Sequence, residues 1–233
     1  MPGIPSDFLQ RPRMLGIVML DTVFPRPVGD IGNPATFPFP VRLRKVSRAS
    51  PQKVIFERAS GMVDDFVSAA QALQADGCKA IVTSCGFLAL HQQTIAAALE
   101  IPFASSSLCW LPTLYHAFGG ARHVGILTAS GASLGAAHLA ALGGSMESPI
   151  VGMPVASEFA RVIVGNQPEG DMDRVHAEMV AAADQLVATQ PQVRAILLEC
   201  TNMPPVAGLI AQRTGRPVFD LVGLARQMMG LAP

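Results

Sequence analysis

The chain has 233 residues and a mass of 24.5 kDa, with 17 basic and 17 acidic side chains. Its length allows a large core, and its 50% hydrophobic and 15% charged residues are typical of a globular protein. The zero net charge excludes the basic surface with which proteins bind nucleic acid or anionic membranes, so we expect neither partner.

The first 13 residues are predicted to be a tail, because they lack the apolar segment of a secretory signal. No apolar stretch reaches the roughly 18 residues of a membrane helix. The four cysteines form no C-x-x-C pair and no zinc-finger spacing with histidine, so no metal site is predicted. We therefore expect a cytoplasmic protein with reduced thiols.

Strands and helices alternate along the chain in two similar series. In the first series, strands are predicted over 14–20, 39–46, 79–84 and 101–105, and helices over 57–77, 88–99 and 107–120. In the second series, strands are predicted over 123–129, 147–155, 193–199 and 216–220, and helices over 132–144, 171–190, 204–215 and 221–230. Apolar strands between helices predict an α/β fold with parallel sheets and helices on both sheet faces.

The second series repeats the first at a nearly constant distance along the sequence. Cys85 and Cys200 are 115 positions apart, and so are Pro102 and Pro217. The opening strands of the two halves are 109 positions apart, which fits a short insertion or deletion before the third strand. We predict two similar parallel-sheet lobes related by a pseudo-twofold axis. The first lobe is predicted over 14–105, completed by 215–233, and the second over 106–214.

The two repeated cysteines stand where parallel sheets bind ligands, beyond the carboxyl ends of strands. Each is predicted to lead into a helix, whose free N–H groups favour a thiolate. If the lobes face each other, Cys85 and Cys200 confront each other across one cleft. Inverting a carbon acid needs a base on one face and an acid on the other, and a thiol titrates near pH ~8.5. No cofactor is required, and the expected partner is a small-molecule carboxylate.

Polar and small residues at the strand ends complete the predicted site. The alternative for every cysteine is a packing role, and we assign that role to Cys78 and Cys109, which have no counterpart in the other half. The Pro-rich segment 24–41 is either a rigid connection or a lid over the substrate. The predicted substrate-binding residues are Asp21, Thr22, Ser84, Gly86, Phe87, Thr128, Ser130, Thr201 and Asn202.

Three motifs resemble the aspartate/glutamate/hydantoin racemase superfamily over about 14–230. They are CTNMP at Cys200, LDT at Asp21 and GILTASG over 125–131. The resemblance implies two α/β lobes, a cofactor-independent (PLP-independent) reaction and a tendency to form homodimers. Amino-acid racemases of this superfamily carry Cys-Asn-Thr at the first cysteine, where this chain has Cys85, Gly86 and Phe87.

The sequence therefore predicts an isomerase: a racemase or epimerase of a small amino acid or related carboxylate, with Cys85 and Cys200 as paired acid and base. One alternative is a cis–trans isomerase of the maleate isomerase type, in which a cysteine attacks the substrate and forms an adduct. Another is a two-lobed protein that binds a small carboxylate without turnover. Arylmalonate decarboxylases, also relatives in this superfamily, need only one cysteine.

Overall fold

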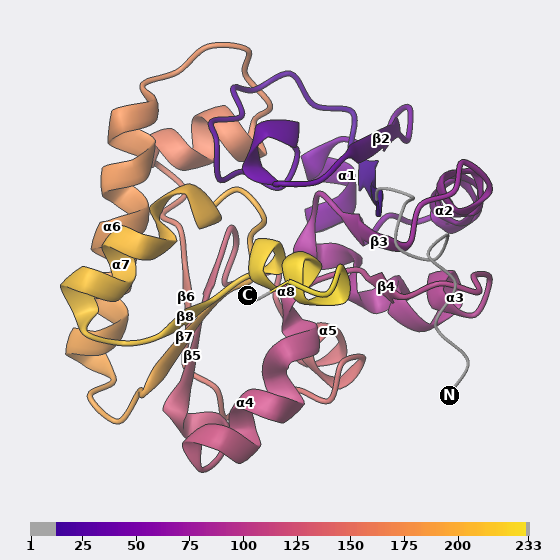
Figure 1. The fold of residues 1–233 in the computed structure, drawn as a ribbon. Helices are drawn as coiled ribbons and strands as arrows, with labels where there is room; N and C mark the ends of the chain where they lie inside the picture. Colours follow the sequence, from indigo (N-terminus) through magenta and orange to yellow (C-terminus); the bar gives the residue numbers. More distant parts are fainter. Residues whose placement is uncertain (1–12, 232–233) are drawn as a thin grey trace.

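The computed structural model describes residues 13–231, so the predicted tail over 1–13 lies, apart from Arg13, outside the described residues. Two four-stranded sheets form the centre of the molecule, and all their strands are parallel (Figure 1). The first sheet has the order β2 (Val41–Lys45), β1 (Leu15–Met19), β3 (Ala80–Thr83) and β4 (Phe103–Ala104). The second has the order β6 (Ile150–Gly152), β5 (Val124–Thr128), β7 (Ala195–Leu198) and β8 (Val218–Phe219).

The two sheets have the same topology, which confirms the predicted fold class. Strands β1 and β5 begin 109 residues apart, whereas β3 and β7, like β4 and β8, begin 115 residues apart. The inner strands β1, β3, β5 and β7 are fully buried along their length because each sheet is covered on both faces. The edge strand β2 is mostly exposed, and its sequence VRLRK alternates charged and apolar residues.

Eight α-helices connect the strands within the described range. They are α1 (Pro51–Phe56), α2 (Val63–Ala75), α3 (Gln92–Ala96), α4 (Leu111–Phe118), α5 (Ala136–Ala140), α6 (Met172–Thr189), α7 (Ala207–Thr214) and α8 (Leu221–Met228).

Helix α1 was not predicted, and α5 is shorter than the helix predicted over 132–144; two further helices differ from the predictions for local reasons. The helix predicted over 57–77 begins only at Val63, because Arg58, Ala59 and Gly61 have positive φ angles that form a turn. The helix predicted over 88–99 is a 3₁₀ helix over Gly86–His91 before α3 begins.

The described part of 215–233, a segment that the sequence assigned to the first lobe, contributes to both sheets. Strand β8 pairs with β7 in the second sheet. Helix α8 packs on the first sheet, where its Leu221 and Ala225 join Leu15 and Ile17 in one buried cluster. Helix α4 does the reverse, since it follows the last strand of the first sheet and covers the second (Figure 1). The boundaries of the two lobes stay a prediction.

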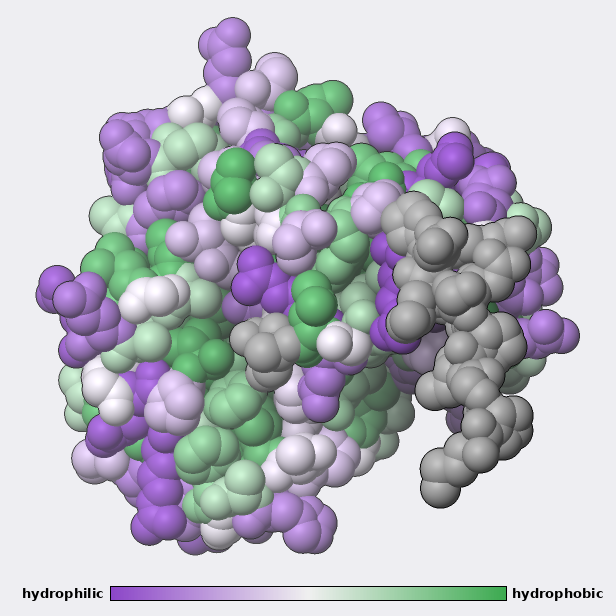
Figure 2. Space-filling view, viewed as in Figure 1, coloured by the Kyte–Doolittle hydropathy of each residue, from purple (hydrophilic) through white to green (hydrophobic). Residues whose placement is uncertain are grey.

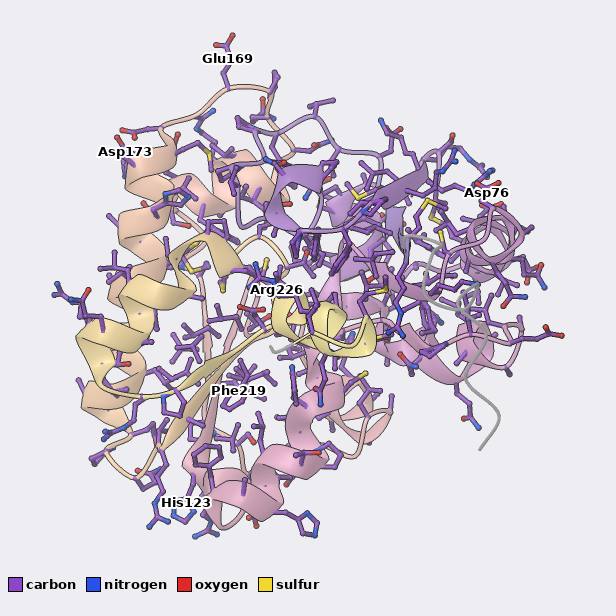
Figure 3. The ribbon with its side chains drawn as sticks, viewed as in Figure 1. Asp76, His123, Glu169, Asp173, Phe219 and Arg226 are labelled. Carbon is purple, nitrogen blue, oxygen red and sulfur yellow. The ribbon has the colours of Figure 1, made fainter. Side chains whose placement is uncertain are left out.

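Aromatic contacts fix α4 against the second sheet. Phe219 of β8, labelled in Figure 3, meets the ring of Trp110 at a centroid distance of 5.7 Å and that of Phe118 at 6.1 Å. On the other side of this region, Arg226 of α8 donates a hydrogen bond of 3.3 Å to the carbonyl oxygen of Thr36. These contacts join the C-terminal segment to both lobes.

The surface mixes hydrophilic and hydrophobic residues over the face shown in Figure 2. None of the helices in the part of the chain that the structure describes is long and apolar enough to cross a membrane. Dimer formation and a cytoplasmic location stay predictions.

Candidate active site

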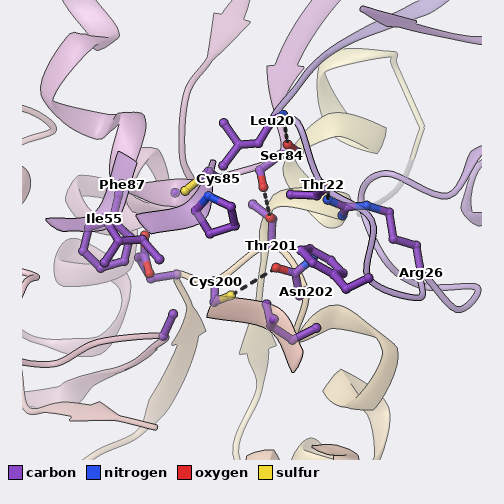
Figure 4. A pocket seen from close by; sticks show the side chains of 16 residues that line it. Leu20, Thr22, Arg26, Ile55, Ser84, Cys85, Phe87, Cys200, Thr201 and Asn202 are labelled. Carbon is purple, nitrogen blue, oxygen red and sulfur yellow. Dashed lines mark hydrogen bonds between the residues drawn. The ribbon is translucent and has the colours of Figure 1, made fainter. Parts of the chain in front are cut away.

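Both repeated cysteines line one cavity between the carboxyl ends of the two sheets (Figure 4). Cys85 follows β3 and Cys200 follows β7, so each lobe contributes one thiol. The space between the lining atoms is about 370 Å³, a figure that includes open solvent. Its lining residues are Leu20, Thr22, Phe24, Arg26, Pro51, Ile55, Ser84, Cys85, Gly86, Phe87, Ala129, Ile163, Glu199, Cys200, Thr201 and Asn202.

Cys85 is held at the start of the 3₁₀ helix by the end of β3. Its N–H donates to Thr83 Oγ1 at 3.4 Å, and this hydroxyl donates to the carbonyl of Ser105 at 2.6 Å. The side chain is buried, and burial together with the nearby Glu199 carboxyl raises the pKa of the Cys85 thiol to about 12. The backbone N–H of Phe87 faces the sulfur and acts in the opposite direction.

Cys200 lies in the equivalent turn of the second lobe. Its thiol donates to Asn202 Oδ1 at 3.6 Å. Burial, then the Glu199 carboxyl, raises the pKa of Cys200 well above its usual range, against a lowering effect of the Asn202 backbone N–H. Backbone N–H groups favour each thiolate as expected, through Phe87 and Asn202, but burial outweighs them. Burial dominates, and α7 begins only at Ala207, after a turn and a 3₁₀ helix.

The two cysteine motifs contact each other directly. Thr201 Oγ1 donates a hydrogen bond of 2.7 Å to the carbonyl oxygen of Ser84, in the other lobe (Figure 4). The hydroxyl of Ser84 in turn accepts the backbone N–H of Leu20 at 2.9 Å. All three residues line the cavity, so these bonds fix the spacing of the two strand ends that carry the thiols.

The Pro-rich segment 24–41 supplies a charged group to the cavity. Arg26 donates to Thr22 Oγ1 at 2.8 Å and forms an ion pair of 2.7 Å with Asp30. Asp30 is buried and also accepts from Asn202 Nδ2 at 2.7 Å. A chain of contacts therefore leads from Arg26 through Asp30 and Asn202 to Cys200. Whether the segment moves as a lid stays a prediction.

Most of the predicted substrate-binding residues line this cavity, but three do not. Asp21 is 44% exposed and pairs with Lys45 at 2.9 Å, and this pairing lowers the pKa of its carboxyl. Thr128 is buried and donates to Glu199 Oε2 at 2.6 Å. Ser130 bonds to Ser133 and lines a separate hollow beside α1. A strand-end position alone does not aim a side chain at the ligand.

Among the cavity residues that sequence reasoning missed, two carry ionisable side chains, Arg26 and Glu199. Glu199 is fully buried, and burial raises its pKa to about 7. A glutamate that ends an apolar strand directly before a cysteine was a usable signal. The approach of Arg26 depends on how the Pro-rich segment folds, although its spacing of four residues from Asp30 fits an ion pair.

No group of three or more histidine, cysteine or acidic side chains is placed to hold a metal ion within residues 13–231.

A protein-family comparison matches residues 63–229 to the family described as Asp/Glu/Hydantoin racemase. Among curated proteins, dimethylsulfoniopropionate lyase of Durusdinium sp. clade D is 30% identical over 89% of this chain and 71% of its own length. Dimethylsulfoniopropionate lyase 7 of Emiliania huxleyi is 31% identical over 89% of this chain and 64% of its own length. The chain thus spans somewhat less than two thirds of the second relative.

Three solved structures share the fold at low sequence identity. A glycine-to-cysteine mutant of arylmalonate decarboxylase has a TM-score of 0.62 at 18% identity, covering 93% of both chains. Aspartate racemase of Picrophilus torridus has a TM-score of 0.55 at 14% identity, covering 94% of this chain and 93% of that one. A mutant of maleate cis-trans isomerase from Nocardia farcinica has a TM-score of 0.57 at 16% identity with the same coverage.

Proposed function

Because this chain belongs to the Asp/Glu/hydantoin racemase family, we propose that it is a cofactor-independent racemase or epimerase of a small carboxylate. Cys85 and Cys200 exchange protons with the carbon next to the carboxylate. The observation that carries this proposal is that each lobe contributes one buried thiol to the same cavity. A reaction that returns a proton to the opposite face of a carbon needs two such groups.

The protonation states of the two thiols fit a reaction in which one thiol acts as the acid and the other, once ionised, as the base. The raised pKa values keep both thiols protonated at neutral pH, so one must ionise before catalysis while the other stays a proton donor. A thiolate formed in an apolar cavity is poorly solvated and therefore a stronger base than in water. The backbone N–H groups of Phe87 and Asn202 face the two sulfurs and favour ionisation of each.

The cavity lining suggests how a carboxylate is held. Leu20, Phe24, Ile55, Phe87 and Ile163 form apolar walls. Among the described residues that line the cavity, Arg26 carries the positive charge, and Thr22, Ser84 and Thr201 carry hydroxyls. We propose that the substrate carboxylate binds on the side of Arg26 and that its carbon substituents pack against the apolar walls.

The test is proton exchange in deuterated water, followed by NMR and chiral chromatography on single enantiomers of small 2-substituted carboxylates. We expect the wild type to invert both enantiomers with deuterium incorporation. Cys85→Ser and Cys200→Ser should each abolish inversion, while each still exchanges the proton of the one enantiomer that the remaining thiol faces. Cys109→Ser, outside the cavity, is the matched control. Full inversion in both single-cysteine variants would refute the proposal.

β-Elimination is the second candidate, and the names of the relatives favour it. Removal of the α-proton of dimethylsulfoniopropionate breaks the C–H bond, forms the C=C bond and releases dimethyl sulfide with the electron pair of the C–S bond. The leaving group is neutral and needs no acid, so a single cysteine suffices. The apolar walls at Phe24 and Phe87 suit its methyl groups.

Gas chromatography for dimethyl sulfide and NMR for acrylate distinguish this candidate from racemisation. If the chain is a lyase, one cysteine variant loses all product and the other keeps a substantial rate. If neither product forms with the wild type at millimolar substrate, this candidate is excluded.

A further inference from the structure

Glu199 is a buried carboxyl that the two-thiol reaction does not use directly. Its side chain is fully buried, and Oε2 accepts the hydrogen bond from Thr128. Oε1 is also buried but has no hydrogen-bond partner. Burying a polar atom without a hydrogen-bond partner is unfavourable, and more so if the group is charged. The site therefore keeps a carboxyl oxygen that packing alone does not explain.

Gly86 provides the space for this oxygen. A β-carbon at position 86 would collide with Oε1, Cδ and the backbone oxygen of Glu199. The backbone of Gly86 does not have a positive φ angle, so its conformation does not require glycine. The glycine after the first cysteine and the glutamate before the second are therefore a matched pair across the two lobes. This pair accounts for the departure at position 86 from the Cys-Asn-Thr pattern.

The charge of Glu199 acts on both thiols. Its carboxylate is the second-largest cause of the raised pKa of Cys85 and of Cys200, after burial in each case. The other ionisable groups around the cavity are Arg26, which lowers the pKa of Cys85, and Asp30, which raises that of Cys200. His138 of α5 packs edge-on against the phenyl ring of Phe87. A thiolate and an ionised Glu199 therefore repel each other in a poorly solvated space.

We propose that Glu199 takes up the proton that a thiol releases, so that the carboxyl and the thiol pair share a single negative charge. This inference rests on the proposed function, in which one thiol must become a thiolate. The S–H bond breaks, an O–H bond forms on Oε1, and the negative charge moves from oxygen to sulfur, so no other reactant is needed. Glu199 acts through the thiols and is in this sense a positioning residue.

Sharing one proton gives a distinctive pH profile. Burial raises the pKa of Glu199 to about 7. Below that pH, each added unit of pH increases the thiolate population tenfold. Above it, the main state is a thiol beside a carboxylate, and moving the proton between them changes no net charge. The thiolate population of the wild type is then constant with pH until both groups ionise.

Glu199→Gln tests this directly, because the amide has the same shape and its oxygen can still accept from Thr128. We would measure the rate of alkylation by iodoacetamide between pH 5.5 and 9, separately at Cys85 and Cys200, by peptide mass spectrometry. The wild-type rate should level off near pH 7. The Glu199→Gln rate should keep rising and exceed that of the wild type by about tenfold at pH 8, one pH unit above the plateau.

Two further variants keep the test decisive. Glu147→Gln, at an exposed residue that pairs with Arg122, is the control and should give the wild-type profile. Thr128→Val removes the hydrogen bond that favours ionised Glu199, so the plateau of the alkylation rate should begin at a higher pH. This variant replaces Glu199→Gln in the test if Glu199→Gln does not fold.

Alkylation needs no substrate, so the inference can fail while the racemase proposal stands, and the reverse. Parallel profiles for the wild type and Glu199→Gln, both rising without a plateau, would overturn it. So would an unmoved plateau in Thr128→Val.

Discussion

The hydroxyl of Thr201 donates a hydrogen bond of 2.7 Å to the carbonyl of Ser84, so the residue after one cysteine is bonded to the residue before the other. Both partners are buried. The bond connects the two lobes at the point where the thiols face the cavity, and the distance between the sulfurs depends on it. Any reaction that uses both thiols on one carbon requires that distance to be fixed.

Replacing Thr201 by valine should therefore weaken both stability and activity. The substitution keeps the shape but leaves the Ser84 carbonyl buried without its donor, at a cost of about 1–3 kcal/mol in the free energy of unfolding. Urea denaturation measures this loss. Thr201→Ser keeps the hydroxyl and should restore most of it. Equal unfolding free energies for the two variants would contradict the structural role of the bond.

Gly86→Ala should lower the free energy of unfolding because of one contact, that between residue 86 and Glu199. The added methyl collides with Glu199, and overpacking of this kind costs about 1–3 kcal/mol. In a Glu199→Ala background part of that collision is removed, so the same substitution should cost less. A double-mutant cycle on unfolding free energies gives the coupling. Strict additivity of the two changes would show that the two residues are not a matched pair.

The buried Glu199 also predicts how stability depends on pH. An ordinary glutamate has a pKa of 4.5, and burial raises that of folded Glu199 to about 7. Below pH 4.5 both states are protonated and folding is not penalised. Between pH 4.5 and 7 the unfolded chain loses the proton before the folded one, so stability falls with rising pH. The loss is about 3 kcal/mol and levels off above pH 7.

Comparison with Glu199→Gln isolates this contribution, because the amide does not titrate. Urea denaturation of both proteins at pH 4.5 and 7.5 should show a larger decrease for the wild type. Other buried groups with a raised pKa, such as Asp220, are present in both proteins and cancel in the difference. A decrease of equal size in both would place the titration elsewhere.

Arg26 is predicted to set the affinity for the substrate carboxylate. Arg26→Met removes the positive charge and leaves Asp30 without its ion pair. On the proposed function, we expect KM to rise at least tenfold, which corresponds to about 1.4 kcal/mol of lost binding. Arg26→Lys keeps the charge but loses the guanidinium group that contacts both Thr22 and Asp30. Its KM should lie between those of the wild type and Arg26→Met. An unchanged KM in Arg26→Met would place the carboxylate elsewhere in the cavity.

Sequence reasoning reached the fold and the thiols through the constant offset between Cys85 and Cys200, since a repeat in sequence becomes a repeat in topology. It did not predict that burial outweighs the backbone N–H groups at both thiols, because burial is a property of the assembled lobes. It missed Glu199, which in the sequence is only the residue after an apolar strand. Its role becomes visible in the structure, where it lies against Gly86. Asp21 also illustrates this limit, because its nearest charged partner, Lys45, lies on a neighbouring strand.

The exchange of helices between the lobes has a consequence for the order of folding. Helix α4 leaves the first sheet to cover the second, and α8 leaves the second to cover the first. During synthesis, one apolar face of the first sheet has no cover until residues 221–228 leave the ribosome. The two lobes should therefore acquire native packing together rather than in succession. The cavity, bounded by both, would form in the last step.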